Sequence, residues 1–176
     1  MNILHDVNPG TKDEMNVIVE IPRGSHNKYE VDKDTGLIKL DRANYGAAPY
    51  PVEYGFVPQT LAEDGDALDV LVFTSYPLFP GVMLTIRPVG FMEMTDDGEV
   101  DNKVIGVPVD DRRWEDVKDI NDLNQHTLRE LKDFFENLKN LKGKAVTTSI
   151  HGFKGKTVAE AAFEKARAMY EDSKKA

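Results

Sequence analysis

Three aspartates stand close together in the segment from Asp64 to Asp69, which reads Asp-Gly-Asp-Ala-Leu-Asp. Carboxylates at this spacing repel one another unless a cation lies between them, and hard divalent metal ions prefer such oxygen ligands. Gly65 supports a tight turn, and the apolar run that begins at Val70 predicts a strand that holds Asp69 rigidly. The segment therefore predicts a metal-binding loop in front of a strand.

Two simpler interpretations of this loop are available. A single aspartate before a strand is more often an ordinary acidic turn. An EF-hand loop does not fit, because with Asp64 and Asp66 at its first and third positions the fifth and twelfth would be Leu68 and Ser75. Those positions need an oxygen ligand and a bidentate glutamate. The loop must therefore obtain further ligands from elsewhere in the chain.

Other charged and aromatic residues stand where a hydrophobic core would not place them. Glu20 interrupts an apolar strand pattern, and Lys28 and Glu30 project to one face of a strand. Each could be a solubility charge or a packing residue. Together they supply carboxylates for several metal ions and cations for phosphoryl oxygens. The set is Glu20, Lys28, Glu30, Arg42, Tyr50, Tyr54, Asp96, Asp101, Lys103 and Lys139.

Most of these residues depend on strands for their positions. Short apolar runs with Gly/Pro turns predict strands at residues 17–21, 36–40, 69–74, 82–94 and 103–109. Strands at this spacing are typical of a small closed or half-closed β-barrel.

The last third of the chain changes to helical spacing. Thr127 with Glu130 forms a capping-box pattern for a first helix, which contains Lys139 and ends near Gly143. A second helix is predicted from Thr157. The chain is expected to form a single α+β domain over residues 1–176, a β-rich body with two C-terminal helices packed outside.

Composition excludes several other classes of protein. The 176 residues are 40% hydrophobic, which is enough for a core. A net charge of −9 and a pI near 4.9 oppose nucleic-acid binding without a local basic patch. No apolar stretch approaches the ~20 residues of a membrane span, and the N-terminus is not that of a signal peptide. The absence of cysteine excludes thiolate metal sites and disulfides and is consistent with a cytoplasmic protein.

At the level of motifs, the chain resembles the family I soluble inorganic pyrophosphatases from Glu20 to the last helix. The segment 64–70 is similar to that family's Asp-Gly-Asp-x-Leu-Asp-Val signature, and further motifs follow the family's order and approximate spacing. These are Val19-Glu20-Ile21-Pro22, Lys28-Tyr29-Glu30, Asp41-Arg42, Tyr50-Pro51-x-x-Tyr54-Gly55, Tyr76-Pro77, Arg87-Pro88-Val89-Gly90 and Asp96 through Lys103.

The resemblance implies a five-stranded OB-like barrel and hydrolysis of pyrophosphate to two orthophosphates. It implies several Mg²⁺ ions per site, with Mn²⁺ or Zn²⁺ as substitutes, and a homo-hexamer. Asp66 would act as general base toward a metal-activated water. The implied metal ligands are Asp64, Asp69, Asp101, Asp96, Glu30 and, through water, Glu20. The implied substrate-binding residues are Lys28, Arg42, Tyr54, Lys103 and Lys139, with Tyr50 supporting the pocket.

Two positions depart from the family pattern. Ala67 stands where the family usually has proline, which removes no ligand. Leu138 stands where the family typically has a phosphate-binding tyrosine. The leucine suits the apolar stripe of the helix, but one phosphate hydrogen bond is missing.

Two other functions compete with the enzyme. A non-enzymatic OB-type domain would bind nucleic acid with basic grooves and stacked aromatic rings, which the −9 charge opposes. A structural calcium-binding protein could use the same carboxylates, but it leaves Lys28, Arg42, Lys103 and Lys139 unexplained. Phosphate release with magnesium compared with calcium separates the latter from the enzyme.

Overall fold

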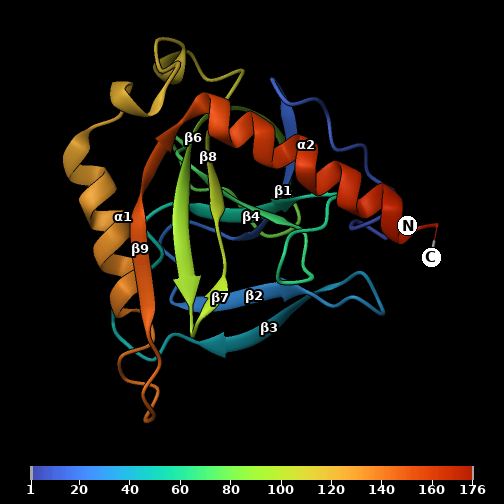
Figure 1. Cartoon of the computed structure of the whole chain (residues 1–176). Coiled ribbons are helices and arrows are strands. Elements are labelled where there is room, and N and C mark those ends of the chain that lie inside the picture. The colour runs from blue at the N-terminus through green and yellow to red at the C-terminus, as the bar shows by residue number, and fades with distance from the viewer. Residues whose placement is uncertain (1, 176) are drawn as a thin grey trace.

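Five strands close into a ring in the computed structural model, which describes residues 2–175 (Figure 1). They follow the order β1, β4, β5, β8 and β6, and β6 pairs back with β1. The ring is antiparallel except for the parallel β5–β8 pair. The bounds are β1 (Met15–Ile21), β4 (Glu53–Val57), β5 (Leu68–Val72), β6 (Met83–Asp96) and β8 (Lys103–Pro108). The expected five-stranded OB-like barrel is confirmed. The two end residues of the predicted domain, Met1 and Ala176, lie outside the described residues.

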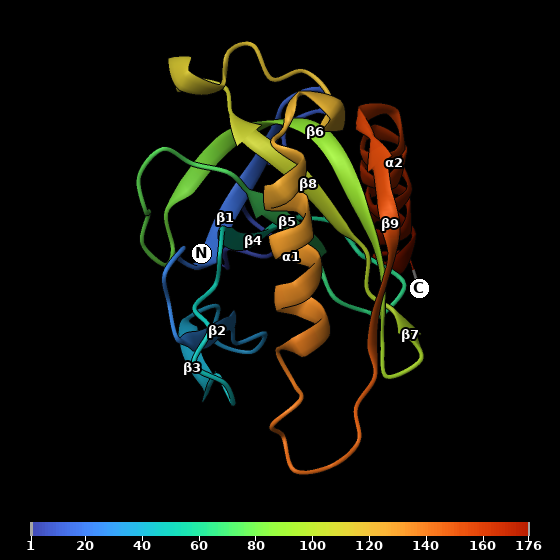
Figure 2. The same ribbon diagram turned by 90° about the vertical axis from the view of Figure 1, so that its left-hand side faces the viewer.

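Two helices cover different sides of the barrel. α1 (Gln125–Asn137) buries Leu128, Leu131, Phe134 and Phe135 in one hydrophobic core. α2 (Lys156–Ser173) buries Ala159, Phe163 and Ala166 in a second core with apolar residues of the barrel strands. Figure 2 shows α1 alongside β9 (Thr148–Gly155), which pairs with β6 and leads into α2. The apolar residues at helical spacing therefore pack against the barrel in both helices, except that Leu141, which continues this spacing in the sequence, lies beyond α1 and is 71% exposed.

A separate two-stranded sheet stands beside the barrel. Strands β2 (Asn27–Val31) and β3 (Ile38–Ala43) form an antiparallel hairpin outside the ring (Figure 1). Short elements complete the chain: β7 (Glu99–Val100), which pairs with β6, and 3₁₀ turns at Arg112–Trp114 and Ile120–Asp122. No helix within residues 2–175 is long and apolar enough to cross a membrane.

The structure corrects the predicted helix ends. α1 begins two residues before Thr127, because Asn124 caps it by accepting a 2.8 Å hydrogen bond from the backbone N–H of His126. It ends at Asn137, so Lys139 lies in the following turn and not in the helix. α2 begins at Lys156, where Gly155 at the N-cap offers no side chain and the backbone N–H of Lys156 donates to the Asp119 carboxylate at 2.9 Å. The predicted capping box of Thr127 and Glu130 does not form, since Asn124 occupies the N-cap position of α1.

Three strands were not predicted: the two-residue β7 and the longer β4 and β9. β4 runs through a segment rich in aromatic residues and proline, and β9 carries His151, Gly152 and Lys154 with no clear apolar alternation. The two longer strands form because neighbouring strands supply hydrogen-bond partners, β1 and β5 for β4 and β6 for β9.

Candidate active site

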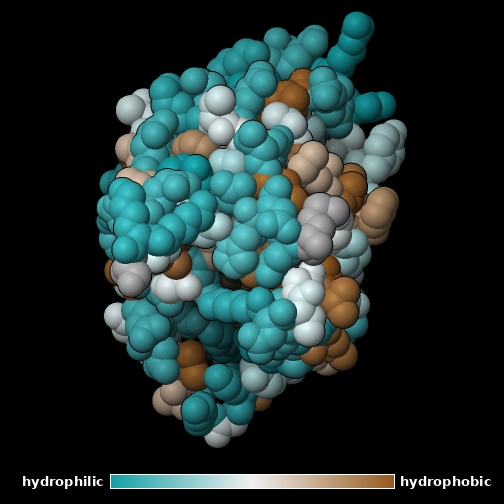
Figure 3. Space-filling view, turned by 90° about the vertical axis from the view of Figure 1, so that its right-hand side faces the viewer, coloured by the Kyte–Doolittle hydropathy of each residue, from teal (hydrophilic) through white to brown (hydrophobic). Residues whose placement is uncertain are grey.

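Every predicted site residue lines one of two adjoining pockets, which share Lys28, Tyr54 and Asp101. The larger is a groove of about 610 Å³ and the smaller holds about 90 Å³. Figure 3 shows that hydrophilic residues cover most of one face of the molecule, which is hollowed in its lower half. The groove is lined by Glu20, Glu30, Asp64, Asp66 and Asp69. The smaller pocket is lined by Arg42, Tyr50, Asp96, Lys103 and Lys139. Tertiary folding therefore joins a carboxylate-rich half to a cation-rich half.

The acidic loop is held in a tight turn directly before β5. Gly65 adopts a φ of +85°, which favours glycine, and its N–H donates to the carbonyl of Ala62 at 3.1 Å. The Asp64 carboxylate accepts a 3.0 Å bond from the N–H of Asp66. Asp69 is already within β5, opposite Phe56 of β4. The strand thus fixes Asp69, as predicted, while Asp66 projects from the loop.

Lys103 is the electrostatic centre of the site. Its side chain is 1% exposed, and its ammonium donates to Asp101 at 2.6 Å, to Asp69 at 2.8 Å and to the Tyr54 hydroxyl at 3.0 Å. Burial would lower the pKa of this ammonium, but the Asp69 and Asp101 carboxylates raise it well above its usual value. A buried cation with three partners is satisfied in this way and locks Asp69 and Asp101 in place.

Several carboxylates of the groove are costly to ionise. Glu20 on β1 is buried, and its carboxylate accepts a 2.8 Å bond from the N–H of Val31. Burial and the facing Asp69 carboxylate raise the pKa of Glu20 to about 8. Burial also raises the pKa of Asp64, and it raises the pKa of Asp101 to about 6 although Lys103 acts in the opposite direction. A cation in the groove would relieve this cost.

The donor set fits a hard divalent cation such as Mg²⁺. The acidic side chains of the groove offer carboxylate oxygens, and the chain has no cysteine. Among residues 2–175 no three histidine, aspartate or glutamate side chains are already gathered as a ligand cluster. In this conformation Lys33, Lys103 and Lys139 take carboxylates as ion-pair partners. A bound cation would therefore have to share these carboxylates with the ammonium groups.

In the smaller pocket, polar and aromatic side chains hold the cationic residues in place. Lys139 pairs with Asp96, which also accepts a 2.9 Å bond from the Thr148 hydroxyl. Burial would raise the pKa of Asp96, but these two hydrogen bonds outweigh it and the pKa is lowered. Burial raises the pKa of Tyr50 to about 12, and its ring packs edge-on against Phe134 at 4.9 Å between centroids. Tyr50 is thus a neutral wall residue at neutral pH.

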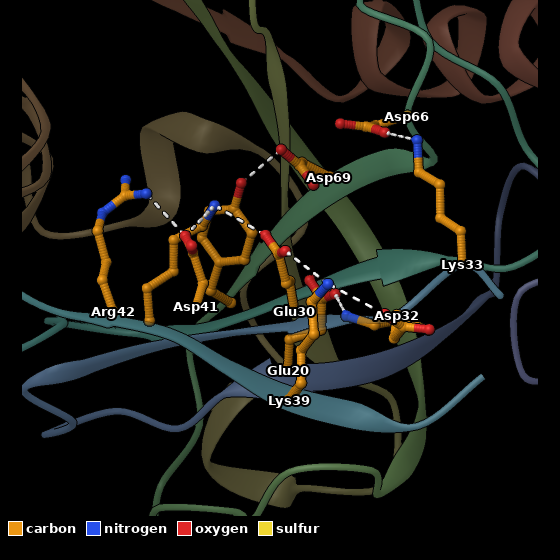
Figure 4. Close-up of polar contacts among 12 residues, drawn as sticks. Glu20, Glu30, Asp32, Lys33, Lys39, Asp41, Arg42, Asp66 and Asp69 are labelled. Carbon is orange, nitrogen blue, oxygen red and sulfur yellow. Dashed lines mark hydrogen bonds and ion pairs between the residues drawn. The ribbon is translucent and has the colours of Figure 1, made fainter. Parts of the chain in front are cut away.

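The hairpin adds charged residues to which the sequence assigned no role (Figure 4). Asp41 pairs with Arg42 at 2.7 Å and with Lys28 at 3.3 Å, so it holds two predicted phosphate-binding cations together. Lys39 lies opposite Glu30 in the β2–β3 register and pairs with it at 3.6 Å. The register of the hairpin, once known, would have revealed the contact of Lys39 with Glu30, whereas Asp41 lies at the register shift and has no partner in the ladder.

Comparison with known proteins then identifies the family. A family model described as inorganic pyrophosphatase matches residues 17–171. The chain belongs to the inorganic pyrophosphatase family.

Named relatives cover nearly the whole chain. The inorganic pyrophosphatase of Geobacillus stearothermophilus is 46% identical over 156 residues, which are 89% of this chain and 93% of the relative. That of Picrophilus torridus is 44% identical, covering 99% and 97%. The crystal structure of inorganic pyrophosphatase from Thermus thermophilus superposes with a TM-score of 0.93 at 41% identity, covering 97% of this chain and 99% of that one. The resemblance inferred from motifs is confirmed, and so is the prediction of a hydrolase enzyme.

Proposed function

We propose that this inorganic pyrophosphatase family member hydrolyses pyrophosphate to two orthophosphates in the cytoplasm, with several Mg²⁺ ions and with Asp66 as general base. One observation carries the proposal: a carboxylate groove opens into a cationic pocket through the shared residues Lys28, Tyr54 and Asp101. Such a site suits a small, dense anion that arrives with metal ions. The net charge of −9 supports a small-molecule substrate over nucleic acid.

The groove carboxylates are the proposed metal ligands. Asp64, Asp69 and Asp101 would hold the activating Mg²⁺, and Asp69 would be shared with a second ion. Asp96 and Glu30 would meet ions that accompany the substrate, and Glu20 would act through water. Bound Mg²⁺ supplies neutralisation of phosphoryl charge and makes a coordinated water more acidic. Mn²⁺ or Zn²⁺ would substitute.

The chain's own side chains would then position the substrate and move the proton. Lys28, Arg42 and Lys139 line the pocket and would orient phosphoryl oxygens, with Lys103 and Tyr54 at its inner wall. Asp66 would accept a proton from the attacking water as its oxygen bonds to phosphorus. The bridging P–O bond then breaks, and the second phosphate leaves with the electron pair and takes up the proton from Asp66, directly or through water. One water and one pyrophosphate yield two orthophosphates.

We also propose that the protein is a homo-oligomer, a hexamer by the family resemblance. Tyr76, Phe79 and Met83 are each more than half exposed although they are large and apolar. Tyr76 and Met83 line a surface hollow of about 660 Å³, together with Leu78 and charged residues from Asp110 to Arg113. Large apolar side chains gathered at one surface are typical of contacts between subunits.

The proposed reaction is tested by measuring phosphate release from pyrophosphate with and without Mg²⁺. ATP, assayed in parallel, should react much more slowly with Mg²⁺, because the pocket has cations for phosphate groups but no site for the adenine ring. Calcium should inhibit, since it is larger and takes 6–8 ligands flexibly. Equal rates on ATP and pyrophosphate, or substantial turnover with calcium as the only metal, would refute the proposal.

A further inference from the structure

An ion pair joins two parts of the groove lining that come from different elements. Lys33, in the turn of the β2–β3 hairpin, pairs with Asp66 of the acidic loop (Figure 4). Among the ion pairs within residues 2–175, this is the one that joins the hairpin to that loop. Both residues line the 610 Å³ groove. The contact therefore engages the proposed base within the groove.

This ion pair is open to water, unlike the buried contacts of Lys103. The side chains of Lys33 and Asp66 are 66% and 59% exposed, against 1% for Lys103. Exposed pairs contribute about 0–1 kcal/mol, because water screens them and two long side chains must be ordered. Lysine also carries its charge on a flexible stem of four carbons. Lys33 can therefore exchange partners at low cost, whereas Lys103 cannot.

A pyrophosphate in the groove would compete for the Lys33 ammonium. The substrate carries several negative charges, while Asp66 carries one, so the Coulomb attraction favours the phosphoryl oxygens at equal distance. The Asp66 oxygen that accepts from Lys33 is occupied by that contact and is not open to a water molecule. The exchange would thus release Asp66 at the moment when substrate is present.

We propose that Lys33 holds Asp66 in the substrate-free protein and moves to the phosphoryl oxygens when substrate enters. This deepens the proposed function and rests on it for the role of Asp66. Lys33 is then a substrate-binding residue that couples release of the base to occupancy of the groove. The positive charge of Lys33 also opposes the binding of Mg²⁺ to the acidic loop before substrate arrives.

The proposal predicts opposite effects of one substitution on two ligands. Lys33→Gln should tighten Mg²⁺ binding to the substrate-free protein by about 2- to 5-fold at low ionic strength, since a competing cation is lost. The same change should weaken binding of imidodiphosphate, a non-hydrolysable pyrophosphate analogue, by about 3- to 10-fold in saturating Mg²⁺. A purely structural role for Lys33 would not move the two affinities in opposite directions.

Titration calorimetry of the full chain measures both affinities without turnover. Lys33→Arg, which keeps the charge, should restore both affinities to within about twofold of wild type. Lys12→Gln is the matched control, because Lys12 is also exposed, pairs with Asp13 at 3.2 Å and does not line either pocket. In steady-state kinetics Lys33→Gln should raise KM while kcat stays within about twofold, since Asp66 is free in either complex.

Unchanged affinities in Lys33→Gln relative to Lys12→Gln would overturn the proposal. Tighter Mg²⁺ binding with unchanged affinity for the analogue would also overturn it, because Lys33 would then not reach the phosphoryl oxygens. Failure of wild type to release phosphate from pyrophosphate would instead refute the proposed function. The two failures are therefore distinguishable.

Discussion

Asp66 differs from the other carboxylates of the site in its surroundings. Asp69 and Asp101 are held by the buried Lys103, and Glu20 is held by a backbone N–H, whereas Asp66 projects into water with Lys33 as its side-chain partner. A general base must release its partner and meet solvent, and a ligand must be held rigidly. Its exposure therefore supports the role proposed for Asp66.

Asp66→Asn should lower kcat by about 10²–10⁴-fold, because an amide cannot accept the proton from water. The fold and Mg²⁺ affinity should be largely kept, since the side chain is exposed. Steady-state kinetics and Mg²⁺ titration measure the two effects. Asp34→Asn is the control: it removes the same charge from a residue that lines the same groove. Near-full turnover of Asp66→Asn at neutral pH would show that Asp66 is not the base.

Glu20 should make the metal-free protein less stable as pH rises. Its pKa is raised from an ordinary value of 4.5 to about 8 by burial, so between these values the folded protein binds a proton that the unfolded chain has lost. The free energy of unfolding then falls with increasing pH, by up to ~1.4 kcal/mol per unit. This contribution is fully present below about pH 4.5 and is lost as pH rises through about 8.

Urea unfolding in EDTA at several pH values between 5 and 8 tests this. Glu20→Gln stays neutral and can still accept the bond from the N–H of Val31, so its stability should depend less steeply on pH than that of wild type. Parallel pH profiles for the two proteins would contradict the predicted cost of the Glu20 charge.

At the scale of elements, the candidate site lies between a loop, a hairpin and a turn. The acidic loop precedes β5, the β2–β3 hairpin stands outside the barrel, and the turn after α1 carries Leu138 and Lys139. β5 is held by hydrogen-bonded ladders on both sides, whereas β2 and β3 pair only with each other. The turn after α1 depends on the packing of Leu138 against the core. The end of α1 is therefore where a substitution can change binding without disturbing the barrel.

Leu138→Tyr should lower KM. Leu138 is half-buried at the C-cap of α1 and lines the small pocket beside Lys139. A tyrosine there could place its ring on the apolar stripe and donate its hydroxyl to a phosphoryl oxygen, a bond worth about 1.5–3 kcal/mol. Leu138→Phe, which adds the ring without the hydroxyl, is the control. Equal KM values for the two variants would mean that the ring only crowds the pocket.

At the scale of the whole molecule, charge and apolar surface are unevenly distributed. The groove collects carboxylates and lysines, while the segment from Thr74 to Leu84 borders an apolar hollow. An acidic chain with a net charge of −9 resists non-specific association, so a localised apolar surface favours a defined contact between copies.

Met83→Glu should reduce the molar mass in solution from that of the oligomer toward that of the 19.7 kDa chain. The reason is that a buried, unpaired carboxylate destabilises an apolar contact. Light scattering after size-exclusion chromatography measures the mass. Leu141→Glu is the control, because Leu141 is also exposed but lies in the turn after α1. A monomeric wild-type protein would refute the proposed oligomer, and an unchanged mass for Met83→Glu would assign the contact elsewhere.

Local patterns were sufficient to predict most of the barrel and the acidic loop that lines the groove. Strands with apolar runs, such as β1 and β5, and the packed faces of both helices follow from periodicity within a few residues. The acidic loop was predicted because like charges that are close in sequence are also close in space. Membership of the pyrophosphatase family followed from motifs in series along the chain.

Contacts between distant segments were decided by the tertiary structure alone. β4 and β9 form because their partner strands supply hydrogen bonds. The position of Lys139 follows from the end of α1 at Asn137, which places this lysine in the turn beyond the helix. The family resemblance could nominate Asp66 as a base, but nothing in the sequence could show that Lys33 reaches it. The two residues are brought together by the placement of the hairpin against the barrel. The physical reason is that an ion pair depends on distance in space, and that distance is set by strand register and packing.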